Sequence, residues 1–441
     1  MSASVFESPV LNRLFPTGET GRLFTDTAEV RAMLLVEGAL ARAQGALGII
    51  PQDSADFLHR SAMEVQIDPA ALAQATGSNG VSVPALVSAF RTALEAPDHA
   101  QYVHWGATSQ DILDTGLMLR LRQALNLIEA DITEVLATLA DLAETHADLP
   151  MPARTYGQHA TPTSFGAVVA QWGTPLLGLR NDLQNLRDRC LLVSLSGAAG
   201  TSSALGPKAS EIRAHMAQSL GLKDPERSWH TDRAPVLQIA DWLLRLTLAL
   251  AKPGEDIIEL VESGVGELSL GQGGASSTMP QKQNPVAPSV LVALSRQQTG
   301  LTQILHSAAV HRYQRDGAAW FTEWMCLPQI VLGAASAAQV ARGLFAKLTP
   351  HANAMDAALN GGLGLIHAEA ISFALAAHMP RPDAQAEVKR LCAVAMETST
   401  SLADLVAHDW PQIAAELDLS SGLGTAPDDA RRFAETARTT D

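Results

Sequence analysis

Residues 117–142 read LMLRLRQALNLIEADITEVLATLADL, and the spacing of their apolar side chains decides the fold class. These side chains recur at intervals of three and four, at Leu117, Leu121, Leu125, Ile128, Ile132, Val135, Leu139 and Leu142. Because an α-helix has about 3.6 residues per turn, this spacing places them in one stripe along a long helix. An apolar stripe of this length must be covered by other helices.

Three further long helical patterns follow, at about 165–189, 236–267 and 286–310. Four long helices in sequence are typical of a helix bundle. The composition agrees, because 47% of the residues are hydrophobic, largely Ala and Leu, and only 5% are aromatic. Small side chains of this kind suit long helices that pack closely. The predicted fold class is therefore all-α, with a central long-helix bundle.

Changes in helix length along the chain predict three domains. Helical segments are short before Tyr102, and shorter segments with more Pro and Gly return after about Leu348. We therefore expect an N-terminal helical domain over residues 1–103, the long-helix bundle over 104–348 and a small C-terminal helical domain over 349–441.

The net charge of −15, with no run of basic residues, argues against nucleic-acid binding and against an anionic membrane surface. The most apolar stretch, 236–251, is interrupted by Asp241 and Arg245, so it predicts a buried bundle helix rather than a membrane span. The three cysteines lack metal-ligand spacing and no secretory signal is visible, which predicts a reduced, cytoplasmic protein. A small anionic substrate stays compatible, because Arg, Lys and helix N-termini can make a locally positive pocket.

Residues 271–285, GQGGASSTMPQKQNP, hold the most informative set of polar side chains. Two hydroxyls (Ser276 and Ser277), a cation (Lys282) and an amide (Asn284) lie in a glycine-rich connection that leads into a helix. A structural loop needs the glycines but not this polar set, which favours a catalytic loop. The alternative interpretation is a solvated turn.

This stretch resembles the signature loop of the fumarase/aspartase superfamily, GSSxMPxKxNP, and departs from it only at Ala275. The resemblance implies a loop that closes over substrate, with Ser276 as general base on a carbon-bound proton and Ser277, Lys282 and Asn284 in support. A serine is a weak base unless its alkoxide is stabilised, so Lys282 and backbone N–H groups must do this in a site closed to water. Ala275 in place of Gly predicts a stiffer loop, with less freedom for the closing motion.

Residues 104–111, HWGATSQD, resemble the first motif of the same family. In that family the Thr and Ser hold a carboxylate at a helix N-terminus, where backbone N–H groups favour an anion. The resemblance implies that His104, Thr108 and Ser109 contact substrate. Taken alone, the sequence TSQD is also a good helix cap.

Residues 154–163, RTYGQHATPT, are similar to the family motif RTHxQxAxP. The resemblance implies substrate contacts from Arg154, Thr155, Tyr156 and Gln158. Many members carry a His after the Thr as general acid or as part of an acid relay, whereas this chain has Tyr156. His159 remains as a candidate catalytic residue, although a lone His in a helical protein is more often structural.

The chemistry of the leaving group can explain why Tyr156 stands where other members have a His. Lyases that expel an amine or hydroxide need an acid, because these groups are strong bases. A lactone opened by β-elimination expels a carboxylate, whose conjugate acid has a pKa of about 4, so it can leave without a proton. The cycloisomerase branch of the superfamily resembles this chain here, with an aromatic residue in place of the His and QHATP after it.

Three further candidates fit a substrate with several carboxylates. Arg233 in SWHTDR and Arg315 in HRYQRDGAAWFTEW lie in blocks that resemble the cycloisomerase branch, and planar guanidinium groups bind carboxylates bidentately. Asn79 in TGSNGVSVP lies where relatives place a substrate-binding Asn. The alternatives are surface ion pairs for the two arginines and an ordinary turn residue for Asn79.

The resemblance therefore implies a cycloisomerase that interconverts 3-carboxymuconate and its γ-lactone without a metal or organic cofactor. It also implies a homotetramer with a twenty-helix core, in which each site gathers motifs from three subunits. Two alternatives remain from the sequence. One is an amine-expelling lyase of the adenylosuccinate lyase type, which predicts a His at the position of Tyr156. The other is a catalytically silent structural protein, of the crystallin type, against which the intact Ser276, Lys282 and Asn284 argue.

Overall fold

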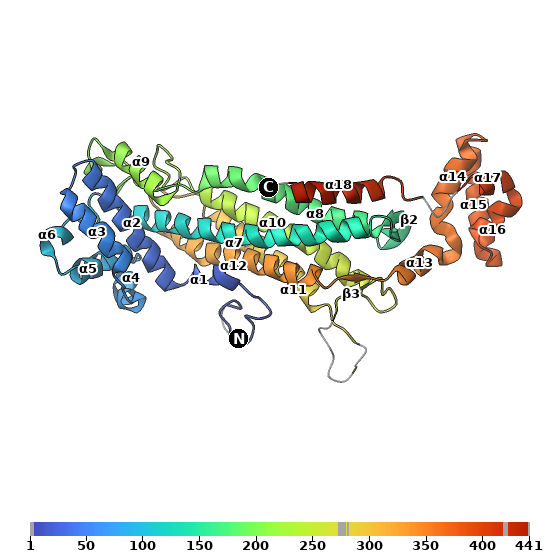
Figure 1. Ribbon diagram of the computed structural model, residues 1–441, viewed down its shortest axis with the longest axis horizontal. Helices are drawn as coiled ribbons and strands as arrows, with labels where there is room; N and C mark the ends of the chain where they lie inside the picture. Colours follow the sequence, from blue (N-terminus) through green and yellow to red (C-terminus); the bar gives the residue numbers. More distant parts are fainter. Residues whose placement is uncertain (1–3, 272–278, 280–281, 418–421, 440–441) are drawn as a thin grey trace. The chain divides into compact units, whose positions relative to one another are not determined.

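The computed structural model describes residues 4–271, 279, 282–417 and 422–439, and over these residues the chain is mainly helical (Figure 1). Within the described residues, eighteen α-helices and three short 3₁₀-helices account for the fold, with two small two-stranded sheets. The prediction of an all-α fold is confirmed.

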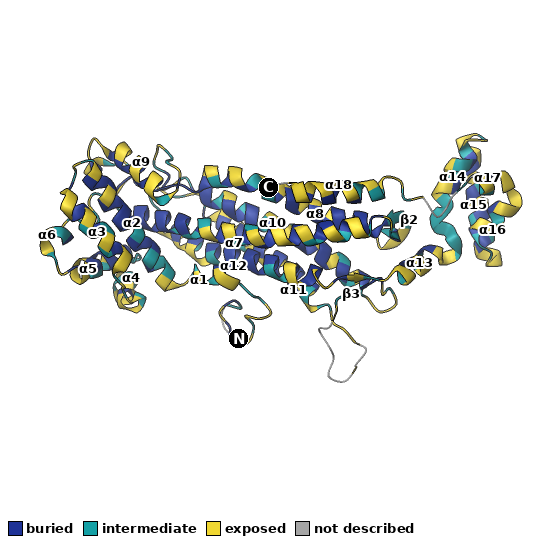
Figure 2. Cartoon of the chain, viewed as in Figure 1, coloured by how far each residue is buried: buried dark blue, intermediate teal, exposed yellow. Residues whose placement is uncertain are grey.

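Five long helices dominate: α7 (Ser109–Thr145), α8 (Phe165–Cys190), α10 (Ala234–Leu260), α11 (Val286–Ser307) and α12 (Gly317–Phe345). The predicted stripe on α7 is buried from Leu121 to Leu139, which confirms the helical spacing, and Figure 2 shows buried residues along these helices. The sequence patterns predicted four of the five. The fifth, α12, is rich in Ala, so its apolar residues make no narrow stripe, and the pattern predicted for residues 236–267 ends at Leu260.

The chain divides into two compact units, each built from separate stretches of sequence. The first comprises residues 1–132, 179–248 and 290–340, and the second comprises 133–178, 249–289 and 341–441. The units do not follow the three consecutive ranges expected from the sequence, and the three-domain division stays a prediction.

The first unit packs short helices together with parts of the long ones. Its short helices are α1 (Gly18–Arg22), α2 (Asp26–Ala46), α3 (Gln52–Glu64), η1 (Pro69–Leu72), α4 (Ala73–Asn79), α5 (Val83–Ala93), α6 (Pro97–Ala100), η2 (Ser203–Leu205) and α9 (Ala209–Leu220). Helix α2 packs against α3 and α9. Among the long helices, Trp242 of α10 is fully buried and donates its indole N–H to the Leu179 carbonyl of α8 at 3.1 Å. This buried contact fixes two bundle helices to each other.

The second unit holds the other parts of the long helices, and its remaining elements lie mostly late in the chain. They are β1 (Pro150–Thr155), β2 (Gln158–Ser164), β3 (Leu268–Ser269), β4 (Thr349–Pro350), α13 (Ala352–Asn360), η3 (Gly362–His367), α14 (Ala368–Ala376), α15 (Arg381–Thr398), α16 (Leu402–Asp409), α17 (Pro411–Glu416) and α18 (Ala426–Thr439). Trp172 of α8 stacks on Phe345 of α12, with ring centroids 6.4 Å apart, and donates to Asp256 of α10 at 2.8 Å. One indole thus joins three helices.

The last five helices of the second unit, α14 to α18, pack in two separate places. Helices α14, α15, α16 and α17 form a small apolar cluster around Ile371, Leu391 and Leu402. Helix α18 pairs with the end of α7 instead, since Arg438 contacts Asp141 and Glu144 at 2.6 Å each.

Strands β1 and β2 form an antiparallel hairpin that the helical patterns did not predict. Its turn residues, Tyr156 and Gly157, both have positive φ, 53° and 72°, as a two-residue hairpin turn requires. The register pairs Arg154 with His159 and Thr155 with Gln158. The motif at 154–163 is therefore a hairpin tip.

By length and composition alone, α10 and α12 could each cross a membrane, and α13 with the bent segment Gly362–Ala376 passes the same test as a pair. In the protein, 56% of the apolar window of α10 and 67% of that of α12 are buried. Burial on this scale fits helices that pack inside a bundle.

Candidate functional site

Helix α7 begins at Ser109, and the buried carboxylate of Asp111 fixes that start. Asp111 accepts a hydrogen bond from the Thr108 backbone N–H at 3.0 Å, and from two backbone N–H groups of the 194–197 loop at 2.8 and 2.9 Å. His230 Nε2 lies 2.8 Å from the same carboxylate. A carboxylate with this many partners is held rigidly. Thr108 and Ser109 are half-buried at the helix N-terminus, where the helix dipole favours an anion.

Arg315 joins this helix start from a segment far away in the sequence. Its Nε donates to Gln110 Oε1 at 2.8 Å, and its terminal N–H groups lie 3.4 Å from both Thr108 Oγ1 and the Ala198 carbonyl. The guanidinium carbon lies 5.9 Å from the centre of the Trp320 ring. The structure therefore brings together Thr108 and Arg315, two of the predicted substrate contacts, with a hydroxyl and a cation side by side.

His104 adds a second group that can be positively charged. Its Nδ1 lies 2.7 Å from the buried Glu37 carboxylate of α2. Burial lowers the pKa of His104, but the hydrogen bond to Glu37 and the charges of Glu37 and Asp111 outweigh this, while Arg91 opposes them. The net effect raises the pKa above its ordinary value, so His104 keeps its positive charge to higher pH than a free imidazole.

Arg233 is not placed to bind a substrate carboxylate. Its side chain is 1% exposed, and it donates to Asp114 at 2.8 and 3.0 Å and to Glu323 at 2.9 and 2.7 Å. The Trp229 ring lies 4.9 Å from the guanidinium carbon. Burial by itself would lower the pKa of Arg233, but the two carboxylates raise it above its ordinary value. The expectation of a substrate clamp is not supported, because protein carboxylates already accept hydrogen bonds from the N–H groups along two edges of the guanidinium.

Asn79 is the last residue of α4, and its side chain is exposed. Gly80 follows with φ of 72° and ends the helix, a conformation that glycine adopts readily. The Phe321 ring lies so close that a Cβ at Gly80 would be 3.0 Å from ring atom Cζ. The end of α4 therefore lies against the start of α12. The role of Asn79 as a substrate contact stays a prediction.

In the second unit, Arg154 ties the β1–β2 hairpin to the segment that precedes the 271–285 loop. Its guanidinium donates to both carboxylate oxygens of Glu267, with NH1 to Oε2 at 3.0 Å, and Glu267 is fully buried. The Glu267 carbonyl in turn accepts from the His351 backbone N–H at 2.9 Å, beside the β3–β4 pair. Arg154 is thus engaged in a bidentate ion pair, which gives it a role in holding the hairpin.

The other predicted residues of this hairpin are exposed. They are Thr155, Tyr156, Gln158 and His159. Tyr156 stands at the tip with its side chain in solvent. An exposed aromatic residue at a hairpin tip is free to contact a ligand or another copy of the chain. The catalytic role of His159 stays a prediction.

The signature loop is only partly described. Ser276 and Ser277 lie outside the described residues. Lys282 and Asn284 are described and exposed, and Asn284 stands two residues before α11 begins. Their carboxylate-binding roles stay predictions.

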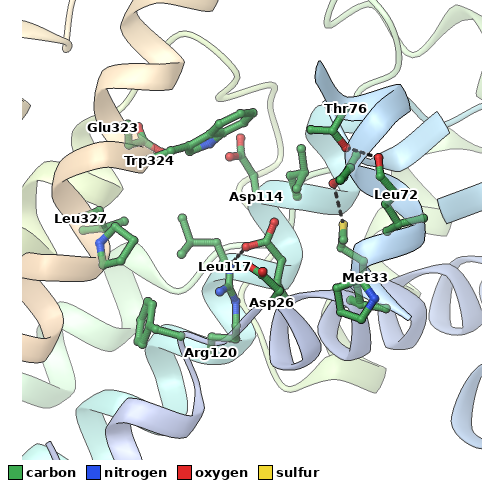
Figure 3. Close-up of a pocket in the computed structure, with 18 residues that line it drawn as sticks. Asp26, Met33, Leu72, Thr76, Asp114, Leu117, Arg120, Glu323, Trp324 and Leu327 are labelled. Atoms are coloured by element: carbon green, nitrogen blue, oxygen red, sulfur yellow. Dashed lines mark hydrogen bonds and ion pairs between the residues drawn. The ribbon is translucent and has the colours of Figure 1, made fainter. Parts of the chain in front are cut away.

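A cavity of about 560 Å³ in the first unit does not contain these groups (Figure 3). Helices α2, α4, α7 and α12 supply its apolar lining, which includes Leu117 and Trp324, while Arg120 pairs with Glu29 at 3.2 Å. Asp26, Asp114 and Glu323 also line it, so carboxylates outnumber the one cation. An anionic substrate would be repelled there. This cavity and the candidate anion site are therefore different places.

Three comparisons with known proteins give the family of the chain. The family profile described as Lyase matches residues 17–300, which is more than half of the chain. The chain belongs to this lyase family, part of the fumarase/aspartase superfamily. The relatives include the 3-carboxy-cis,cis-muconate cycloisomerase of Pseudomonas aeruginosa, 38% identical over 90% of this chain and 87% of the relative. The nitrosuccinate lyase of Streptomyces davaonensis is 34% identical over 96% of this chain and 94% of its own.

A solved structure agrees with the relatives found by sequence. The 3-carboxy-cis,cis-muconate lactonizing enzyme from Pseudomonas putida superposes with a TM-score of 0.91 and 33% identity. The match covers 98% of this chain and 99% of that one. This chain and the Pseudomonas putida enzyme thus share their helical architecture over nearly their whole lengths.

Sequence patterns did not reveal the buried polar residues that hold the superfamily motifs in place. These are Glu37, Gln110, Asp111, Asp114, His230, Glu267 and Glu323. Gln110, Asp111 and Asp114 were visible as a polar cluster in the first two turns of a long helix, and buried charges are rare unless paired. Their partners could not be found, since His230, Arg233 and Glu323 come from distant segments. Within the described part of the chain, no group of three or more His, Cys, Asp or Glu residues could hold a metal.

We predict that Glu37→Gln shifts the pH dependence of substrate binding to lower pH. In the wild type the raised pKa of His104 keeps it cationic, so the KM for an anionic substrate should rise only as the pH passes through that raised value. By linkage, the stability that the charged pair contributes is fully present below the unfolded-state pKa of the imidazole and is lost as the pH rises through the raised folded-state pKa. KM–pH profiles and an NMR titration of His104 measure the shift.

Glu29→Gln is the matched control, because Glu29 lies on the same helix but pairs with Arg120. Its profile should coincide with that of the wild type. Identical profiles for Glu37→Gln and the wild type would contradict the assignment.

We also predict that Arg233→Met destabilises the protein by roughly 3–5 kcal/mol, because two buried carboxylates are left facing each other. The midpoint of urea unfolding measures the loss. Arg227→Met serves as control, since the Arg227–Asp232 pair is exposed and should contribute little. A change no larger in Arg233→Met than in this control would show that the buried pair is not needed.

Proposed function

We propose that this chain is a 3-carboxy-cis,cis-muconate cycloisomerase, which interconverts 3-carboxy-cis,cis-muconate and 4-carboxymuconolactone in the degradation of aromatic compounds. The observation that carries the proposal is Tyr156 at the exposed hairpin tip, where an amine-expelling lyase needs an acidic His. The likeness to the cycloisomerase of Pseudomonas aeruginosa over 90% of the chain supports it.

In the direction of lactone opening, the Ser276 alkoxide removes a proton from the carbon next to a carboxylate. The electron pair moves into that carboxylate to form an enediolate, and then forms the new C=C bond as the ring C–O bond breaks. The released oxygen becomes part of the third carboxylate of the tricarboxylate product. In the direction of lactone formation that carboxylate adds to the double bond, and Ser276 returns the proton to the adjacent carbon.

Each charge in this scheme has a candidate partner. The enediolate carries two negative charges on one carboxyl group, and Thr108, Ser109 and the N-terminus of α7 stabilise it where the charge develops. Arg315 and the cationic form of His104 bind the other carboxylates of the substrate. Lys282 stabilises the Ser276 alkoxide, with Ser277 and Asn284 in support.

Tyr156 fits this scheme because the leaving group is a carboxylate. Its conjugate acid has a pKa of about 4, so the carboxylate leaves as an anion near neutral pH. The hairpin then needs no proton donor at its tip. Tyr156, Thr155, Gln158 and Asn79 contact the substrate as neutral groups, while His159 lies opposite Arg154 in the hairpin.

A second candidate is a lyase that expels another weakly basic group. The likeness to nitrosuccinate lyase over 96% of the chain favours it, since nitrite also leaves without protonation. This candidate shares the base and the carboxylate-binding groups and differs only in the substrate.

We place the enzyme in the cytoplasm as a homotetramer. Its three cysteines are free, which suits a reducing compartment. Large apolar side chains are exposed on the long helices, with Leu248 on α10 at 47%, Ile304 on α11 at 50% and Met325 on α12 at 63%. Exposed apolar residues on bundle helices are what a helical core between subunits would cover.

The proposed function predicts that the wild type converts 3-carboxy-cis,cis-muconate with loss of its ultraviolet absorbance. Ser276→Ala should lower kcat by about three orders of magnitude with little change in KM, because only the proton transfer is lost. Ser219→Ala on α9 is the matched control, since its hydroxyl only bonds the Met216 carbonyl. Rapid nitrite release from nitrosuccinate with no turnover of the muconate would favour the second candidate.

The proposed assembly predicts a tetramer in sedimentation equilibrium at assay concentrations. Because each site takes motifs from different subunits, a mixture of inactive Thr108→Ala and Ser276→Ala chains, unfolded and refolded together, should recover part of the activity. An active monomer, or no recovery in mixed tetramers, would contradict the shared site.

A further inference from the structure

Gln110 is a fully buried amide whose orientation is dictated by its neighbours. Its Nε2 donates to Asp114 Oδ2 at 3.1 Å and to the His230 carbonyl at 2.9 Å. Both partners are acceptors, so the NH₂ side of the amide must face them. The remaining atom, Oε1, is thereby turned toward Arg315 Nε at 2.8 Å.

The acceptor that orients Gln110 is itself fixed. Asp114 takes a bidentate pair of hydrogen bonds from Arg233, and Arg233 is held from its other side by Glu323. All three side chains are at most 3% exposed. An unbroken series of hydrogen bonds therefore runs from the buried ion pairs through Gln110 to Arg315.

Arg315 itself has few other strong contacts. Beyond Gln110, its terminal N–H groups lie 3.4 Å from Thr108 Oγ1 and from the Ala198 carbonyl, the Trp320 ring is 5.9 Å from the guanidinium carbon, and the side chain is only half-buried. An arginine in such surroundings loses rotamer freedom when it binds a carboxylate, and that loss weakens binding. Fixing Nε in advance leaves the two terminal nitrogens at a set position beside the Thr108 hydroxyl.

We infer that Gln110 is a positioning residue that holds Arg315 ready for a substrate carboxylate, and that Asp114, Arg233 and Glu323 act on the substrate only through it. The inference rests on the role of Arg315 in the proposed function. The buried ion pairs that stabilise the fold would then also orient a substrate-binding arginine.

A double-mutant cycle tests whether Gln110 acts through Arg315. Gln110→Met keeps the length of the side chain but loses all three hydrogen bonds, and KM should rise about tenfold or more with a smaller change in kcat. Arg315→Ala should raise KM by at least as much. The double variant should be no worse than Arg315→Ala alone, because the second change removes the group that the first one positions.

Gln298→Met is the matched control for the loss of a buried amide. Gln298 is fully buried and donates to the Gln329 carbonyl at 3.3 Å, without any link to Arg315. It should lower the melting temperature and leave KM unchanged. Gln110→Glu adds a second comparison, since it keeps an acceptor for Arg315 but neutralises the guanidinium charge and repels Asp114, so KM should rise here too.

A crystal structure of Gln110→Met separates this inference from the proposed function. Arg315 should leave its position beside Thr108 or occupy several conformers. An unmoved Arg315, or effects of the two substitutions on KM that add fully, would overturn the inference whatever the substrate. Failure of the wild type to convert the muconate, with Arg315 displaced in the variant, would instead remove the proposed substrate and keep the positioning role.

Discussion

The buried ion pairs of Arg233 with Asp114 and Glu323 are the constraint on which the candidate site depends. They join the first turns of α7, the residue before α10 and the start of α12. Removing three charges from water is costly, and the cost is offset only when all three meet in good geometry. The ion pairs therefore fix the relative position of these helices at this end. The positions of the 104–111 motif and of Arg315 are fixed with them.

Asp111 and Asp114, in the first turns of α7, bind different partners. Being three residues apart, they lie on one face of the helix. Asp111 accepts hydrogen bonds from backbone N–H groups and lies beside His230, whereas Asp114 forms an ion pair with Arg233. The hydroxyls of Thr108 and Ser109 are left half-buried at the helix N-terminus. The two buried carboxylates thus hold the 104–111 motif in place. The hydroxyls of Thr108 and Ser109, together with Arg315, are then available to bind an anion.

The sequence predicted what local spacing controls and missed what distant contacts control. The stripe of α7 was visible because one helix carries it, whereas the hairpin at 150–164 was hidden by prolines and by a turn that places Tyr156 at positive φ. Arg233 illustrates the limit for the site. Its motif predicted a substrate clamp, yet Asp114 and Glu323, 119 and 90 residues away, occupy its guanidinium. No pattern in the sequence pairs these residues.

The sign of the local charge, rather than the size of a cavity, identifies where a polycarboxylate can bind. The protein carries a net charge of −15, so most of its surface repels such a substrate. The cavity beside Asp26 and Glu29 shares that repulsion despite its volume of about 560 Å³. Around Thr108 the balance differs, because hydrogen-bond donors surround the Asp111 carboxylate, the cationic form of His104 balances Glu37, and Arg315 remains to bind an anion. A helix N-terminus with Arg315 beside it can therefore favour an anion even in an acidic protein.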